Sequence, residues 1–96
     1  MEKKEIRKID SLLRQFVRAN NLEKGLAEHR LMKAWYELLG VTVAKRTRSL
    51  HIRNRKLYVT LHSSVIRNEL NMIKQSLIPR LNQAAGMEVI DDIVLK

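Results

Sequence analysis

The hydrophobic pattern of this chain changes period twice, and this change most limits the folds open to it. From residue 4 to about residue 45, apolar residues recur every three or four positions, which is the period of helices packed by one face. Over residues 49–62 they alternate with polar residues, as in half-buried strands, and from residue 63 the helical period returns. The pattern therefore predicts an α+β fold with a hairpin between helices.

Two helical stretches precede the hairpin. The first is predicted over residues 4–19, and Asn20-Asn21 ends it. The second either ends at Gly40 or continues through it at the cost that a glycine brings to a helix interior, and we favour continuation to about Lys45. Its spacing assigns Trp35 to the core rather than to an exposed anchor. The stripe of this second helix consists of Leu31, Trp35, Leu38 and Leu39.

The hairpin has a self-consistent register. Asn54-Arg55 lies between its two alternating runs, and asparagine tolerates the positive φ of a tight turn. If Arg53 faces Lys56, the alternating apolar residues of both strands fall on one face of the sheet. Residues of the opposite set, including the pair His51 and Tyr58, then lie on the outward face.

The remainder of the chain predicts a third helix and a third strand. Ser63 or Ser64 is suited to cap the helix at its start, Pro79 must kink or divide it, and Gly86 is suited to end it. The Val- and Ile-rich stretch 87–95 then predicts a strand. The predicted helix stripe is Ile66, Leu70, Ile73, Leu77, Leu81 and Ala84.

These elements give the order α-α-β-β-α-β, with the helices on one face of a small three-stranded sheet. The 96 residues fit a single domain over 1–96, with residues 1–4 expected to fray. The longest nearly apolar stretch, residues 38–44, is far shorter than the ~20 residues of a membrane helix. With no cysteine and no signal-peptide pattern, the chain is expected to be soluble and cytoplasmic.

The positive charge of the chain is concentrated in one segment. The net charge is +9, from 19 Lys and Arg against 10 Asp and Glu. Residues 45–56 hold six of the basic residues and no acidic residue, so this segment alone accounts for +6. Such a concentration is typical of a surface that binds a polyanion, although Lys and Arg also protect edge strands from aggregation.

We therefore assign the candidate nucleic-acid-binding surface to the hairpin and its approach. Like charges at Arg53 and Lys56 need compensation, which a phosphate backbone would supply, and Tyr58 is placed to stack on an unpaired base, with His51 nearby. The predicted binding residues are Lys45, Arg46, Arg48, His51, Arg53, Arg55, Lys56 and Tyr58.

Nothing in the sequence predicts catalysis or a cofactor. The three histidines have no second ligand at a metal-binding spacing, and adjacent Asp91 and Asp92 would point to opposite faces of a strand. Ser63 and Ser64 lack the context of a nucleophile, and no glycine-rich loop could cradle a phosphate. We expect a binding protein with no metal and no cofactor.

Several positions together resemble the DciA-like family, a family of unknown function that includes a bacterial replicative-helicase loader. The resemblance runs from about residue 12 to residue 95. It depends on the order and spacing of short pieces. These are Trp35-x-x-x-x-Gly40, Ala44, Thr47, Leu57-Tyr58-Val59, Ser63-Ser64, Glu69-Leu70, Leu81-Asn82, Gly86 and the final Val/Ile strand.

The resemblance implies a KH-type domain and a non-enzymatic role in bacterial DNA replication, with DNA and a DnaB-type helicase as partners. The chain lacks the G-x-x-G loop by which KH domains clamp a nucleic-acid backbone, so the basic hairpin is the expected substitute.

An RNA-binding KH-like module agrees equally well with the fold and charge, and a third alternative is a protein-interaction domain whose basic face binds an acidic partner. The sequence contains no heptad pattern and leaves the oligomeric state open.

Overall fold

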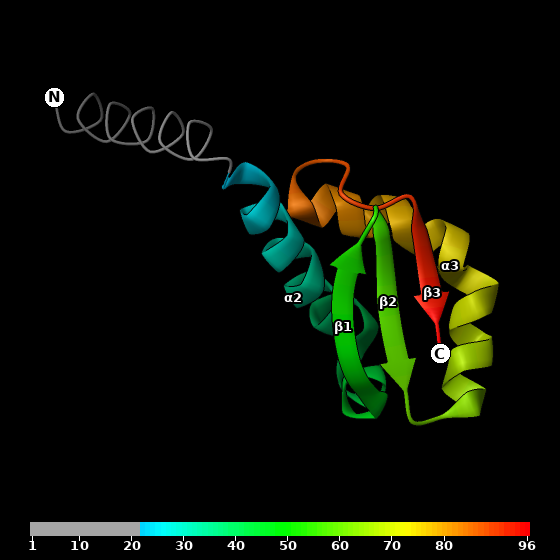
Figure 1. Ribbon diagram of the computed structural model, residues 1–96. Coiled ribbons are helices and arrows are strands. Elements are labelled where there is room, and N and C mark those ends of the chain that lie inside the picture. The colour runs from blue at the N-terminus through cyan, green and yellow to red at the C-terminus, as the bar shows by residue number, and fades with distance from the viewer. Residues whose placement is uncertain (1–21) are drawn as a thin grey trace, which may run out of the picture.

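The computed structural model describes residues 22–96, which form two helices and three strands (Figure 1). The predicted helix over residues 4–19 and the fraying of residues 1–4 lie outside the described residues. The elements are α2 (Glu23–Arg46), β1 (Thr47–Arg53), β2 (Lys56–Leu61), α3 (Ser64–Ala85) and β3 (Asp92–Leu95).

Helix α2 continues past Gly40, as predicted, but its backbone breaks there. Gly40 has φ 83° and ψ −179°, a conformation that only glycine adopts without steric cost. Leu38 was predicted on the buried stripe but is 38% exposed. The buried row of α2 recurs every four residues through Ala27, Leu31 and Trp35 to Leu39, and Leu38 lies beside this row. Leu39, which was on the predicted stripe, and Val43 both pack against the core.

The hairpin has the predicted register. Arg53 pairs with Lys56, and the pairing continues along the two antiparallel strands as expected. Asn54 and Arg55 both have positive φ, 50° and 61°, which is the geometry of a type I′ turn. A register shift between Thr47 and Ser49 marks a bulge at the start of β1.

Strand β3 is shorter than predicted and runs parallel to β2. The sequence predicted a strand over residues 87–95, but the strand covers only Asp92–Leu95. Of the residues before β3, Val89 and Ile90 are held by hydrogen bonds to a side chain of α3 rather than by backbone pairing with β2. The Asn82 Oδ1 accepts hydrogen bonds from the backbone N–H groups of Val89 and Ile90, and its Nδ2 donates to the Ile90 carbonyl.

Helix α3 begins and ends at the predicted caps. The Ser63 hydroxyl accepts a hydrogen bond from the Ile66 N–H, and Gly86 takes the left-handed conformation at φ 85°. Pro79 lies inside the helix without dividing it, and α3 bends along its length (Figure 1).

The buried stripe of α3 differs from the predicted one at two positions. Ile73 is 45% exposed and Ala84 is exposed, while Ala85 is buried. The buried residues after Leu70 are Leu77, Leu81 and Ala85, which recur at a spacing of four. Because α3 bends, the residues spaced by four stay against the sheet, whereas the mixed three- and four-residue spacing of the predicted stripe does not.

The two helices cover one face of the sheet, whose strand order is β1-β2-β3 (Figure 1). The core lies between these layers and includes the fully buried side chains of Trp35, Leu57 and Leu81. This confirms the α+β architecture and the predicted order of the elements from α2 onward, while the KH-type classification stays a prediction. Neither α2 nor α3 is long and apolar enough to span a membrane.

Candidate nucleic-acid interface

Among residues 22–96, no helix or strand covers the face of the sheet opposite α2 and α3, here called the outer face (Figure 1). Because side chains alternate along a strand, the register places His51 and Arg53 of β1 on this face beside Tyr58 and Lys56 of β2. Of the eight predicted binding residues, Tyr58 is half-buried and seven are exposed. The exposed ones are Lys45, Arg46, Arg48, His51, Arg53, Arg55 and Lys56.

The predicted pair of like charges stands at the turn end of the outer face. Arg53 and Lys56 are direct partners across the two strands. On the other side of Lys56, the parallel register brings Asp92 of β3 beside it. This carboxylate offsets part of the repulsion, although Arg53 is left without an acidic neighbour in the sheet register. The sequence argument missed Asp92 because a parallel pairing of β3 with β2 has no local sequence signal.

The remaining predicted cations stand at the other end of β1. Lys45 and Arg46 lie in the last turn of α2, where positive charge favours the helix dipole, and Arg48 lies at the bulge. Since β1 has seven residues, about 20 Å separates this group from Arg53. The structure therefore places the cations at both ends of the strand and does not bring them into one cluster.

Between the two charged ends, three side chains form a column across the sheet. The rings of His51 and Tyr58 stack at a centroid distance of 4.9 Å and an interplanar angle of 6°. The Lys96 Nζ lies over the Tyr58 ring, 5.4 Å from its centroid. Because β2 is the central strand, His51 and Lys96 approach Tyr58 from opposite sides. Both faces of the Tyr58 ring are thus occupied, which disfavours the predicted stacking of this ring on an unpaired base.

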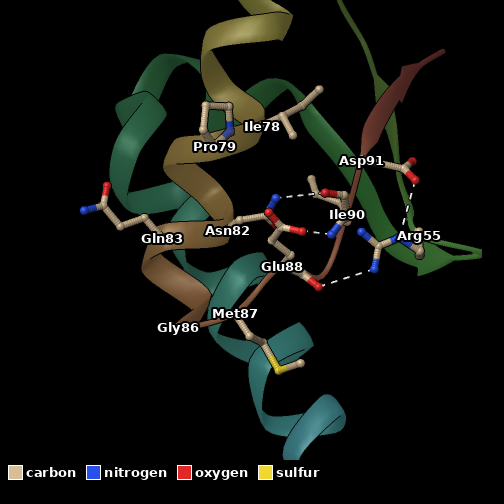
Figure 2. A pocket seen from close by; sticks show the side chains of 10 residues that line it. All are labelled: Arg55, Ile78, Pro79, Asn82, Gln83, Gly86, Met87, Glu88, Ile90 and Asp91. Carbon is tan, nitrogen blue, oxygen red and sulfur yellow. Dashed lines mark hydrogen bonds and ion pairs between the residues drawn. The ribbon is translucent and has the colours of Figure 1, made fainter.

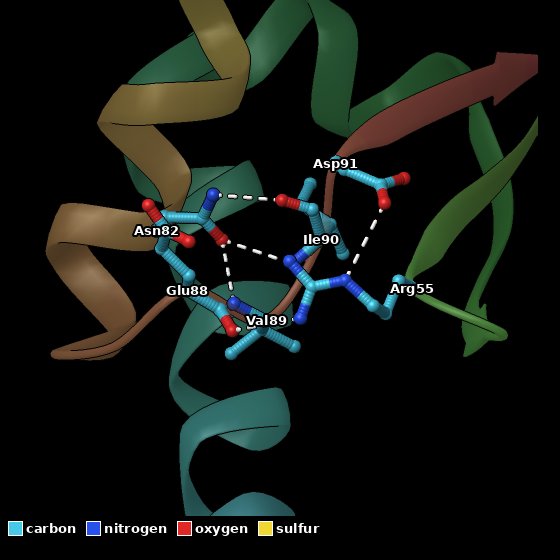
Figure 3. Close-up of polar contacts among 6 residues, drawn as sticks. All are labelled: Arg55, Asn82, Glu88, Val89, Ile90 and Asp91. Carbon is cyan, nitrogen blue, oxygen red and sulfur yellow. Dashed lines mark hydrogen bonds and ion pairs between the residues drawn. The ribbon is translucent and has the colours of Figure 1, made fainter.

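Arg55 differs from the other predicted binding residues because its side chain turns toward the loop before β3 (Figure 3). Its Nε lies 3.4 Å from the Asp91 carboxylate, and its Nη1 donates to the Glu88 carbonyl at 3.5 Å. The Asp91 N–H in turn donates to the Arg55 carbonyl at 2.8 Å. These contacts attach the hairpin turn to the loop and bring a carboxylate beside the Arg55 guanidinium, whose side chain is still 52% exposed.

A pocket of about 640 Å³ opens beside these contacts, between the end of α3 and the same loop (Figure 2). Its charged lining residues are Arg55, Glu88 and Asp91, and the others are apolar or neutral. Two acidic side chains against one cation give no attraction for an anion. The pocket is therefore separate from the basic outer face. Across residues 22–96, no cluster of three or more His, Asp or Glu side chains could hold a metal ion.

Asp92 is the acidic group of the outer face, and its surroundings favour its charged form. The Ile93 N–H donates to its Oδ1 at 2.8 Å, and the Lys74 Nζ lies 3.3 Å from the same oxygen. These contacts, together with the charge of Lys56, outweigh partial burial and hold the pKa of Asp92 below the ordinary carboxyl value.

The lowered pKa predicts how Asp92 affects stability as the pH changes. A carboxyl whose pKa is lower in the folded state contributes stability at neutral pH, and that contribution disappears as the pH falls through the folded-state pKa. We expect Asp92→Asn to be less stable than the parent at pH 7, and the difference to shrink below about pH 4. Urea unfolding at pH 7, 4 and 3 measures this. A difference that stays constant over this range would contradict the assignment.

The fold and its surface define the class of this protein: a small α+β domain whose sheet has a basic face that no element within residues 22–96 covers. The chain belongs to the DciA family, because the family model described as "Dna[CI] antecedent, DciA" matches residues 8–95. This confirms the resemblance seen in the sequence.

A curated relative is the UPF0232 protein of Corynebacterium glutamicum (strain R). It is 24% identical over 85 residues, which cover 88% of this chain and 48% of the relative. The chain therefore spans about half the length of that relative. No solved structure matches the chain.

Proposed function

We propose that this protein is a non-enzymatic accessory that binds nucleic acid, with DNA favoured, through the outer face of its sheet. The observation that carries the proposal is a sheet face that no described element covers, with exposed cations on it at the turn end and beside it at the other end of β1. Arg53 and Lys56 stand at one end, Lys45, Arg46 and Arg48 at the other, and Lys96 lies between them on the far side of Tyr58. Asp92 is the acidic side chain that the sheet register places among them.

The spacing of these cations suits a phosphate backbone. The ~20 Å between the two ends corresponds to about six base-pair steps of duplex DNA at 3.4 Å each. Because both faces of the Tyr58 ring are occupied, stacking on unpaired bases contributes little, and contacts to phosphates dominate. Phosphate contacts position a protein without reading sequence. The proposed binding is therefore salt-sensitive and nearly independent of sequence.

Membership in the DciA family supports a role in bacterial DNA replication. We propose that the domain works in the cytoplasm beside a DnaB-type replicative helicase, and that it holds DNA where the helicase acts. In this role the domain supplies binding and positioning, while the helicase supplies the ATP-driven chemistry.

Fluorescence anisotropy with labelled oligonucleotides of equal length tests the proposal. We expect micromolar affinity for duplex DNA, with a logarithmic salt slope of about three to five, because five cations outside the Arg55 contacts are placed at the two ends of β1. A single strand with abasic sites in place of bases should bind about as well as the normal strand, since its phosphates are unchanged.

Two results would count against this account. An absence of binding to every oligonucleotide at low salt would overturn the proposal itself. A strong preference for the normal single strand over the abasic one would retain nucleic-acid binding but contradict the dominance of phosphate contacts. A matched RNA strand in the same titration decides between DNA and RNA.

A further inference from the structure

Strand β1 stands at an edge of the sheet, and within residues 22–96 it pairs with β2 alone. Hydrogen bonds between β2 and the chain end that follows β3 show which backbone groups of β2 point toward β3 and which point toward β1. The Lys96 N–H donates to the Val59 carbonyl, and the Leu61 N–H donates to the Lys96 carbonyl. Odd-numbered residues of β2 therefore direct their backbone groups toward β3, and even-numbered ones direct theirs toward β1.

The register then assigns the backbone groups of β1. His51 and Arg53 are paired with Tyr58 and Lys56, so their N–H and C=O groups point into the sheet. Leu50 and Ile52 point theirs outward, and no described residue forms a hydrogen bond with them. Because a backbone polar group needs a partner, this edge is a template for another extended segment.

The side chains of β1 are also less covered than those of its neighbour. Leu57 and Val59 on β2 are completely buried, whereas their partners Leu50 and Ile52 on β1 are only half-buried. On the helix-covered face of the sheet, the half-buried side chains of Leu50 and Ile52 therefore form an apolar edge along β1. An added strand with apolar residues at alternate positions would cover this apolar edge and complete the core layer.

Charge indicates which kind of strand would fit. The sequence has no acidic residue between Glu37 and Glu69, and Arg48 and Arg53 stand near the two ends of β1. A second copy of this chain, paired through its own β1, would bring like charges together along the new ladder, which is destabilising. An extended segment with acidic residues at alternate positions would instead meet opposite charges.

We propose that the free edge of β1 binds an extended acidic segment of another protein, which adds to the sheet as a fourth strand. This interaction differs from the proposed nucleic-acid binding because its hydrogen bonds come from the backbone of Leu50 and Ile52, which phosphate contacts do not use. Its acidic side chains would meet Arg48 and Arg53, so the two ligands share these two side chains.

Amide hydrogen exchange by NMR on the full chain tests this proposal directly. The probe is a synthetic peptide of about eight residues that alternates Val and Glu, which is an ordinary strand length. In the free protein, the Leu50 and Ile52 amides should exchange quickly, while those of His51 and Arg53 are protected. On addition of the peptide, the Leu50 and Ile52 amides should become at least about tenfold slower to exchange.

Two matched comparisons separate strand addition from simple charge attraction. A peptide with the same composition but its Val and Glu residues in two blocks should bind at least about tenfold more weakly. Ile52→Pro should weaken binding of the alternating peptide by about tenfold relative to Ile52→Ala. Proline removes an outward N–H without breaking a bond to β2, and alanine keeps that N–H.

The proposal is overturned by any of three results. These are equal binding of the two peptides, peptide binding without protection of Leu50 and Ile52, or protection of these amides without peptide together with a doubled mass in sedimentation. The last result would assign the edge to a second copy of this chain. Because the parent protein is used for the exchange experiment, the test does not depend on whether Ile52→Pro folds.

Discussion

Reversing both charges at the turn end of the outer face, with Arg53→Glu and Lys56→Glu, is expected to lower the affinity for duplex DNA about 100-fold at ~0.1 M salt. Each phosphate contact contributes roughly a factor of ten at this salt concentration through the release of a counterion. The double variant removes two such contacts and adds repulsion. The salt slope of binding should also fall by about two. Anisotropy titrations of both proteins at several salt concentrations measure these changes.

A matched control separates local contacts from the change in overall charge. Lys24→Glu combined with Arg80→Glu changes the net charge by the same amount, but both residues are exposed on the helices rather than on the outer face. We expect this control to weaken binding less than about tenfold, because charges beyond a Debye length of ~10 Å are largely screened. If the two double variants lose equal affinity, the outer face is not the binding surface.

The largest effect on stability is expected from Trp35→Ala. Trp35 is completely buried, and its indole N–H donates to the Thr47 hydroxyl at 3.1 Å. That hydroxyl donates to the Val43 carbonyl at 2.8 Å, so one side chain joins two parts of α2 to the start of β1. Truncation should lower the free energy of unfolding by about 3–5 kcal/mol. This is a large share of the ~5–15 kcal/mol that stabilises a typical domain.

Urea unfolding followed by circular dichroism measures the loss, and two further variants refine its interpretation. Met72→Ala, at a side chain that is 85% exposed, should change the free energy of unfolding by less than about 0.5 kcal/mol. Thr47→Val leaves the buried indole N–H without an acceptor and should cost about 1–3 kcal/mol. A loss below about 1 kcal/mol for Trp35→Ala would contradict the central place of Trp35 in the core.

The sequence predicted most of this fold because its signals are local. The alternation in the hairpin and the asparagine at its turn were enough to specify the register, including the pairs Arg53–Lys56 and His51–Tyr58. The helix caps at Ser63 and Gly86 have equally local causes, since each depends on the conformation of a single residue. The buried position of Trp35 followed from helical spacing.

The features that escaped prediction depend on contacts between distant residues. The parallel pairing of β3 with β2 brings Asp92 beside Lys56 and Lys96 over Tyr58, and neither contact has a sequence signature. Arg55 turns toward Asp91 because the loop before β3 lies next to the hairpin turn. For the candidate site, the sequence thus indicated which residues carry charge. The structure was needed to show which of them share the outer face.

An NMR titration of the ¹⁵N-labelled protein with a short DNA duplex tests the central claim most directly. We predict that the amide shifts that change most belong to residues 45–58 and Lys96, with the largest changes around the paired positions Arg53 and Lys56. Residues along α3 and around the pocket beside Asn82 should change little. Shifts concentrated on α3, or no shifts at low salt, would contradict the assignment of nucleic-acid binding to the outer face.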